Sequence, residues 1–191
     1  MTELQLWEVL AVLLAVVYLV LAIRQNIWCW AAAAVSTLLY LFIMYRASLY
    51  MESALQIFYL AMAAYGWYEW RHGGAGGEEL QVTTWPMRYH LFALAAVFGL
   101  VLISGELLTR YSAAALPFLD SFTTWGAVVA TFMVARKILE NWIYWFVIDA
   151  VSIGLYLSRE LYFTAALFAA YLVMIVIGYR KWRGSMQENA A

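Results

Sequence analysis

The sequence predicts an all-α integral membrane protein with seven transmembrane helices, and two observations carry this prediction. The first is composition: the 191 residues are 66% hydrophobic and 12% charged, with a mean hydropathy of +0.77. Soluble domains carry about 25% charged residues. The second is that the apolar residues fall into seven runs close to the length that crosses a bilayer, about 17–25 residues. The runs cover residues 6–23, 28–44, 50–70, 90–108, 119–134, 139–158 and 161–179.

Each run is expected to be a helix, because a backbone in lipid must satisfy its own hydrogen bonds and the runs lack the alternation of barrel strands. The first run, 6–23, does not resemble a cleavable signal, since residues 1–5 carry no positive charge. The fifth run, 119–134, is the shortest and is diluted by Asp120 and a threonine pair, but we still count it as a helix.

The basic residues predict the orientation of these helices. With seven helices the connecting segments alternate sides, and eight of the eleven Lys and Arg residues then fall on one side. Cytoplasmic segments are enriched in Lys and Arg, so we expect the N-terminus outside and the C-terminus inside. The eight are Arg24, Arg71, Arg88, Arg136, Lys137, Arg180, Lys181 and Arg183, and the other three are Arg46, Arg110 and Arg159.

Aromatic residues and glycines recur in the same order in the two halves of the chain. Residues 49–71 are matched 112 residues later, whereas Asn26 and Trp30 match Asn141 and Trp145 at an offset of 115, and Ser36 and Tyr40 match their partners at 116. The matches at 112 are Leu49, Tyr50, Tyr59, Gly66, Trp70 and Arg71 with Leu161, Tyr162, Tyr171, Gly178, Trp182 and Arg183. Chance similarity between aromatic-rich segments is the alternative, but the matches are too many and too ordered to favour it.

The repeat predicts a 3+1+3 arrangement. We expect a first three-helix repeat at 1–71, a cytoplasmic loop and connector helix at 72–118, a second repeat at 119–183 and a tail at 184–191. One helix between two three-helix units gives them the same topology, a parallel repeat of the kind found in transporters. The loop contains a glycine-rich stretch at 73–77, which predicts a flexible tether rather than a phosphate-binding loop, because no Lys-Ser/Thr pair follows it.

Several function classes are disfavoured. Cys29 is the only cysteine, and His72 and His90 show no ligand spacing, so we expect neither a metal nor another cofactor. A net charge of −1 gives no reason to expect nucleic acid as a partner. No nucleophile is paired with a base, and Glu69 and Glu140 are interpreted as solvated or helix-terminal charges, which disfavours an enzyme.

Four of the predicted helices carry a polar and aromatic stripe on an otherwise apolar surface. Such stripes are expected to face one another or an aqueous cavity, because polar groups facing lipid would be left unpaired. The stripes are Asn26, Trp30, Ala33, Thr37 and Tyr40; Glu52, Gln56, Tyr59, Ala63, Trp67 and Trp70; Asp120, Thr124, Ala127 and Thr131; and Asn141, Trp145, Asp149, Ser152 and Tyr156.

Asp149 is the most informative member, because a carboxylate near the middle of a membrane helix costs about 2.5–3.5 kcal/mol. A bound cation, a proton or neighbouring donors must compensate that cost. We favour a ligand contact over the alternative, in which hydroxyl groups hold Asp149 as a packing element between helices.

The tryptophans divide into two groups. Trp7, Trp85 and Trp182 lie near span ends and are interpreted as interfacial residues, and Trp70 fits either group. Trp67, Trp142 and Trp145 lie further in, where they could stack on a flat cationic ligand or pack in the core.

At these positions the chain resembles the Pnu-type vitamin transporters, the nicotinamide riboside transporter (PnuC) family. The likeness runs over nearly the whole chain and is weakest between the two halves. It rests on Leu49-Tyr50, Gln56, Gly66-Trp-Tyr-Glu-Trp70, Arg136-Lys137, Glu140-Asn-Trp-Ile-Tyr-Trp145, Asp149 and Gly178-Tyr-Arg-Lys-Trp182.

This resemblance implies a homotrimeric facilitator in the bacterial cytoplasmic membrane that imports an unphosphorylated vitamin precursor, which a cytoplasmic kinase then traps. It also implies that Trp142, Trp145 and Asp149 form a Trp-x-x-Trp-x-x-x-Asn/Asp ligand motif and that Gln56 is a polar ligand contact. Nicotinamide riboside is the first choice of substrate. Thiamine is nearly as good, because its aminopyrimidine can donate to a carboxylate, and ion-coupled symport is an alternative mechanism.

The complete candidate set combines the stripes with this motif. It is Asn26, Trp30, Gln56, Tyr59, Trp67, Thr124, Asn141, Trp142, Trp145, Asp149 and Ser152. Gly66 and Gly178 are added as close-packing or hinge points between rocking units.

Overall fold

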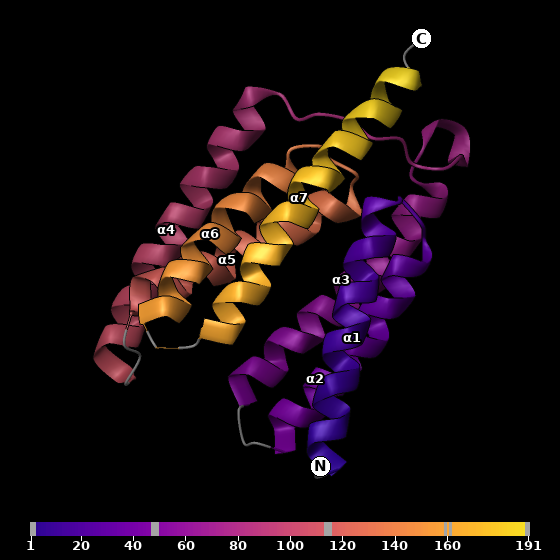
Figure 1. Ribbon diagram of the computed structural model, residues 1–191. Helices are drawn as coiled ribbons and strands as arrows, with labels where there is room; N and C mark the ends of the chain where they lie inside the picture. The colour runs from indigo at the N-terminus through magenta and orange to yellow at the C-terminus, as the bar shows by residue number, and fades with distance from the viewer. Residues whose placement is uncertain (1–2, 47–49, 113–115, 159, 161, 190–191) are drawn as a thin grey trace. The chain divides into compact units, whose positions relative to one another are not determined.

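The computed structural model describes residues 3–46, 50–112, 116–158, 160 and 162–189. Over these residues it contains seven α-helices and one short 3₁₀ helix, η1 (Ala75–Gly77). Figure 1 labels the α-helices on the ribbon. The predicted all-α architecture is therefore confirmed. The helices are α1 (Glu3–Ile23), α2 (Trp28–Arg46), α3 (Tyr50–His72), α4 (Met87–Tyr111), α5 (Pro117–Ala135), α6 (Asn141–Ser158) and α7 (Tyr162–Glu188).

Some residues that carry the predictions are not described by the structure. Leu49, Arg159 and Leu161 lie outside the described residues, as does the side chain of Glu52.

Three helices in the described ranges are long and apolar enough to cross a membrane. They are α4, α5 and the Ala165–Glu188 part of α7, and the Val9–Ile23 and Trp28–Ile43 segments are shorter apolar helices. Helix α7 continues to Glu188, so residues 184–188, which we expected in a tail, are helical. Methionine, glutamine and glutamate are good helix formers, and they continue the helix past the less favourable Gly184.

The chain divides into two compact units. Unit 1 comprises Met1–Gln81 with Ala135–Lys137, and unit 2 comprises Val82–Val134 with Ile138–Ala191. In unit 1, α2 packs against both α1 and α3, and in unit 2, α6 packs against α7.

The connector helix α4 belongs to unit 2. The indole N–H of Trp125 on α5 donates to Ser104 Oγ on α4 at 3.1 Å. Phe118 packs so closely on Gly105 that a Cβ there would lie 2.4 Å from a ring carbon, so these two helices meet at a site that only glycine fits. Helix α4 is thus a packed member of the second unit as well as a link between repeats.

The loop between α3 and α4 is only partly a tether. Gly76 and Gly77 adopt positive φ angles of +75° and +85°. Beyond them the loop is tied down: within unit 2, Leu139 N–H donates to the Thr83 carbonyl at 2.8 Å, and Trp85 N–H donates to Glu140 Oε2 at 3.2 Å. The tether prediction is wrong for this part, and Glu140 anchors the loop instead of being only a solvated charge.

The internal repeat runs in a single register. Helices α1 and α5 end at Ile23 and Ala135, which are 112 residues apart. This is the offset found between residues 49–71 and their partners.

The connecting turns repeat with the same offset. Gln25 and Lys137 both adopt left-handed φ angles, +53° and +48°. In both turns the next residue donates its N–H five residues back at 2.9 Å, Asn26 to Leu21 and Ile138 to Met133. The offsets of 115 and 116 that we inferred for this region are therefore wrong, and Trp30 corresponds to Trp142. The error arose because Trp142 and Trp145 lie one helical turn apart, so either one can be aligned with a single tryptophan.

Candidate binding site

In unit 1, two tryptophans and a glycine form a packed cluster between α2 and α3. The Trp30 ring lies directly over Gly66, where any Cβ would overlap it, and meets the Trp70 ring edge-on with centroids 5.6 Å apart. Both rings are buried. Trp70 is therefore a core residue rather than an interfacial one.

Unit 2 repeats this cluster between α6 and α7. The Trp142 ring covers Gly178, where a Cβ would lie 2.6 Å from the ring, and meets Trp182 edge-on at 5.4 Å. Trp182 is 0% exposed, so its interpretation as an interfacial residue is wrong. The sequence analysis offered Gly66 and Gly178 as close-packing or hinge points, and both are close-packing points. A hinge role for them stays a prediction.

These clusters give Trp30 and Trp142 a structural role. Each ring fills the contact between two helices, as expected if these tryptophans pack in the core. Their indole N–H groups are buried and find no acceptor among the described residues. Ligand contact by either ring stays a prediction.

Asp149 on α6 is buried. It is 6% exposed, and no described residue of unit 2 donates a hydrogen bond to its carboxylate or pairs with it. The nearest hydroxyl along the helix, Ser152 Oγ, donates instead to the Ile148 carbonyl one turn back, at 2.9 Å. The alternative in which hydroxyls of this unit hold Asp149 in place is therefore not supported.

Two of the candidate asparagines serve the backbone. Asn26 Oδ1 accepts the Trp28 N–H at 3.0 Å, which caps the start of α2. Asn141 is fully buried at the start of α6, and its Nδ2 donates to the Ile138 carbonyl at 2.6 Å. These contacts give both residues a structural role at the start of a helix.

The remaining candidates divide between the two units. In unit 1, Gln56, Tyr59 and Trp67 on α3 are half-buried, and Trp67 meets Trp28 edge-on at 5.5 Å. In unit 2, Thr124 on α5 and Trp145 on α6 are half-buried. Trp145 lies one helical turn before Asp149. That the two sets form one shared site stays a prediction.

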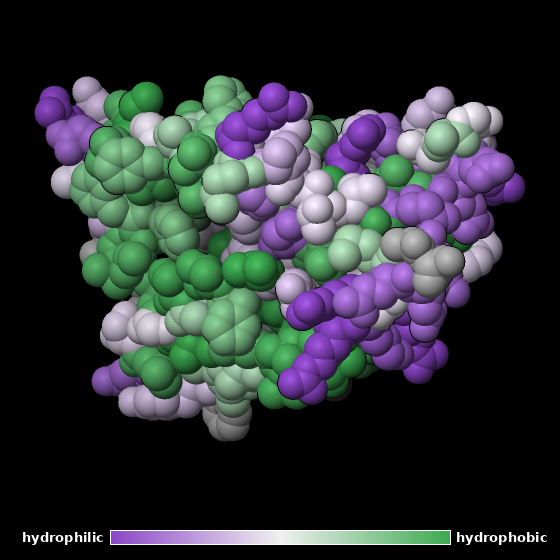
Figure 2. Space-filling view, turned by 90° about the horizontal axis from the view of Figure 1, so that it is seen from above, coloured by the Kyte–Doolittle hydropathy of each residue, from purple (hydrophilic) through white to green (hydrophobic). Residues whose placement is uncertain are grey.

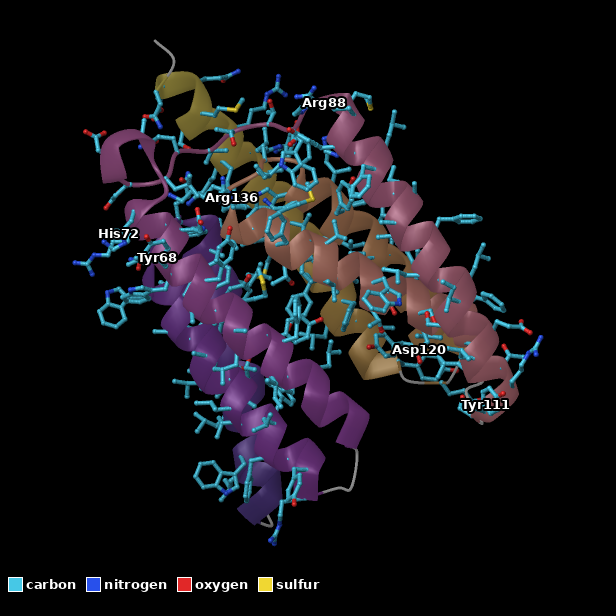
Figure 3. All side chains as sticks on the ribbon, turned by 180° about the vertical axis from the view of Figure 1, so that it is seen from behind. Tyr68, His72, Arg88, Tyr111, Asp120 and Arg136 are labelled. Atoms are coloured by element: carbon cyan, nitrogen blue, oxygen red, sulfur yellow. The ribbon has the colours of Figure 1, made fainter. Side chains whose placement is uncertain are left out.

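A charged cluster in unit 1 was missed by the sequence analysis. Arg136 donates to Glu69 Oε2 at 2.7 Å and to the Tyr65 hydroxyl at 3.4 Å, and Lys137 Nζ lies 4.7 Å from the Trp70 ring centre. Arg136 lies at the same end of unit 1 as Tyr68 and His72 (Figure 3). Glu69 is thus a paired, buried residue and not a solvated charge.

The cluster shifts the acid–base behaviour of its two basic groups. The hydrogen bond to Tyr65 and the nearby Glu69 carboxylate raise the pKa of Arg136, which keeps the guanidinium charged. Burial lowers the pKa of the Lys137 amine. The sequence could not reveal this ion pair, because Glu69 and Arg136 are 67 residues apart and their spacing says nothing about how close they lie in space.

Comparison with known proteins decides the family. The sequence model described as "Nicotinamide mononucleotide transporter" matches residues 5–184. The chain belongs to this transporter family. It is accordingly a multi-pass membrane protein of a bacterial transporter family and not an enzyme, and the resemblance to the Pnu-type vitamin transporters is confirmed.

Two curated relatives and one solved structure are similar. The riboflavin/roseoflavin transporter RibM of Streptomyces davaonensis is 28% identical over 89% of this chain and 81% of its own length. The nicotinamide riboside transporter PnuC of Escherichia coli is 27% identical over 78% of this chain and 73% of its own. A crystal structure of the vitamin B3 transporter PnuC matches 94% of this chain and 81% of its own with a TM-score of 0.72 at 24% identity, which supports the fold.

Proposed function

We propose that this protein imports an unphosphorylated vitamin precursor by facilitated diffusion and that cytoplasmic phosphorylation traps the product. Relatives of the same family are named as transporters of nicotinamide riboside and of riboflavin. The proposal includes a 3+1+3 arrangement in the bacterial inner membrane, with the N-terminus outside and the C-terminus inside.

The distribution of charge supports this orientation. Arg88 lies at one end of α4, and Tyr111 lies at the other end, close to Asp120 of α5 (Figure 3). Arg88 thus lies at the end of unit 2 that we assign to the cytoplasm, where basic residues are enriched.

The observation that carries the function is the buried carboxylate of Asp149, which pairs with no described residue of unit 2. A charge in a membrane helix is expensive and marks a substrate or ion pathway by default. No described residue of unit 2 compensates it. A cationic substrate would supply the missing partner, and the half-buried ring of Trp145, one turn away, could stack on a flat cation.

A buried carboxylate beside an aromatic ring favours nicotinamide riboside, whose pyridinium ring is flat and cationic. Thiamine fits the same carboxylate and remains an alternative. Riboflavin is a second candidate for a different reason, the 28% identity to RibM over 89% of this chain. Riboflavin is neutral, so it would use Asp149 as a hydrogen-bond acceptor rather than as a counter-charge.

Alternating access follows from the repeat. Two similar three-helix units can rock about a shared site, and Gly66 and Gly178 would be the close-packed points where α3 and α7 move against their neighbours. A homotrimeric assembly belongs to the same proposal and rests on the family resemblance.

Calorimetric titration of the purified protein with nicotinamide riboside, thiamine and riboflavin tests the substrate. We expect nicotinamide riboside to bind most tightly and Asp149→Asn to weaken it, while Glu106→Gln, an exposed carboxylate on α4, serves as the charge-matched control. Tightest binding of riboflavin, with no loss in Asp149→Asn, would reverse the order of substrates.

Uptake into vesicles that contain no kinase tests the mechanism. A facilitator equilibrates the substrate and no more. Accumulation above the outside concentration, driven by a proton or sodium gradient, would replace facilitation with ion-coupled symport.

A further inference from the structure

Unit 2 carries a groove that contains only one of the candidate substrate residues, Trp142. It lies between α6 and α7, has a volume of about 540 Å³ and is lined only by residues of these two helices. The lining residues are Trp142, Ile143, Phe146, Ile175, Val176, Tyr179, Arg180, Arg183, Gly184 and Gln187.

The groove changes character along its length. Its walls at Ile143, Phe146 and Val176 are apolar and exposed. Toward the end of α7 it is bordered by Tyr179, Arg180 and Arg183. Figure 2 views the molecule from the end where the last turns of α7 lie, and hydrophilic side chains gather there beside hydrophobic surface.

The two arginines at this end pair with no described acidic residue of unit 2. Arg180 and Arg183 are exposed, lie three residues apart on one helix face, and make no ion pair or hydrogen bond with the described residues of unit 2. Like charges at this spacing repel each other on a helix surface. An anion between them would remove that repulsion.

We propose that this groove binds an anionic phospholipid. Its phosphate would lie between Arg180 and Arg183, and an acyl chain would follow the apolar wall of Ile143, Phe146 and Val176. Basic pockets between transmembrane helices on the cytoplasmic side are typical binding sites for anionic headgroups. The site depends on the membrane location that the family shows, and not on the substrate or on facilitated diffusion.

The apolar wall argues against a soluble anion as occupant. Free phosphate would use the arginines and leave most of the groove empty.

The position of the groove suggests what the lipid does. Trp142 forms part of the groove and also covers Gly178 in the packed cluster. A lipid in the groove would contact Trp142 and would thereby stabilise the α6–α7 pair.

Native mass spectrometry of the detergent-purified protein tests the proposal with phosphatidylglycerol and phosphatidylcholine as probes. We expect one tightly retained phosphatidylglycerol per chain, and weaker binding of phosphatidylcholine. The double variant Arg180→Gln and Arg183→Gln should weaken phosphatidylglycerol binding by about 30-fold, the scale of two basic contacts to an anionic surface. The control variant, Lys181→Gln with Arg71→Gln, removes the same charge outside the groove and should bind normally.

A second variant tests the apolar part without changing the charge. A Cβ at Gly184 would meet nothing within 4 Å, so Gly184→Leu can project into the groove without a clash. Leucine is also the better helix former, so folding should not suffer. We expect Gly184→Leu to reduce lipid retention while leaving the melting temperature in lipid-free detergent unchanged or raised.

Four results would overturn the proposal. They are equal retention of both lipids, equal loss in the control variant, complete displacement of the lipid by inorganic phosphate, and a change of oligomeric state in Gly184→Leu with unaltered lipid retention. The last would identify the groove as an interface between copies. Each result can occur with substrate binding intact, so failure here is distinguishable from failure of the proposed transport function.

Discussion

The two halves of the chain share their packing but not their chemistry. Trp30, Gly66 and Trp70 in unit 1 are matched at an offset of 112 by Trp142, Gly178 and Trp182 in unit 2, with ring contacts of 5.6 and 5.4 Å. Other positions on the same helices do not match. Ala33 and Thr37 on α2 correspond to Trp145 and Asp149 on α6.

This difference indicates which features the fold needs and which the function needs. The tryptophan–glycine cluster holds a helix pair together, so both units keep it. The buried carboxylate and its neighbouring ring occur once, which points to a single binding determinant contributed by the second repeat.

The charged cluster shows the same asymmetry. Arg24 and Arg136 occupy equivalent turns, but Arg136 pairs with Glu69 at 2.7 Å, whereas the residue equivalent to Glu69 in the second repeat is Lys181. The ion pair therefore cannot occur at the matching place in the second repeat.

The largest effect is expected where the shared packing is broken. Gly178→Leu forces a side chain into the Trp142 ring and should destabilise the protein by about 3 kcal/mol, the upper range for overpacking. A thermal-melting measurement in detergent checks this. Gly154→Leu on α6 is the control, because a Cβ there meets nothing within 4 Å. Normal insertion and wild-type transport in both Gly66→Leu and Gly178→Leu would exclude the packing and hinge role.

The next effect concerns the residue that the first repeat lacks. Asp149→Asn should weaken binding of nicotinamide riboside by about 1–3 kcal/mol, the scale of a hydrogen bond to a charged group, because the counter-charge is lost. Titration calorimetry measures it, and Thr37→Val at the equivalent place in unit 1 should have little effect. Unchanged affinity together with a lower melting temperature would make Asp149 a structural residue.

A somewhat smaller effect is expected for the neighbouring ring. Trp145→Ala should weaken binding of a cationic vitamin by about 1–2 kcal/mol through loss of a cation–π contact. Trp7→Ala, an exposed tryptophan in α1, provides the matched control in the same titration. Equal losses in the two variants would remove Trp145 from the site.

The smallest effect tests the asymmetric ion pair. Glu69→Gln should lower stability by about 1 kcal/mol, since the Arg136 side chain is 42% exposed and water screens the interaction. Arg24→Gln, at the turn equivalent to Arg136, should change stability by less than about 0.5 kcal/mol. Chemical denaturation in detergent compares the two, and an equal response would show that the pair contributes nothing measurable.

The sequence by itself determined the fold class, the number of helices and the existence of the repeat. These are local properties: a hydrophobic run of sufficient length must become a helix in lipid, because its backbone has no other hydrogen-bond partners. Glycines and tryptophans at a fixed spacing likewise indicated two equivalent helix pairs before any contact was known. Asp149 stood out for the same local reason, a charge in an apolar run.

Only the tertiary structure decided which side chains meet. It placed Trp182 in a core rather than at an interface, joined Glu69 to Arg136 across 67 residues, and fixed the register at 112 because the turns at Gln25 and Lys137 adopt the same geometry. Hydropathy and periodicity describe one helix at a time. Distances between helices depend on how rings and glycines fit together, and that fit appears only when the helices are packed.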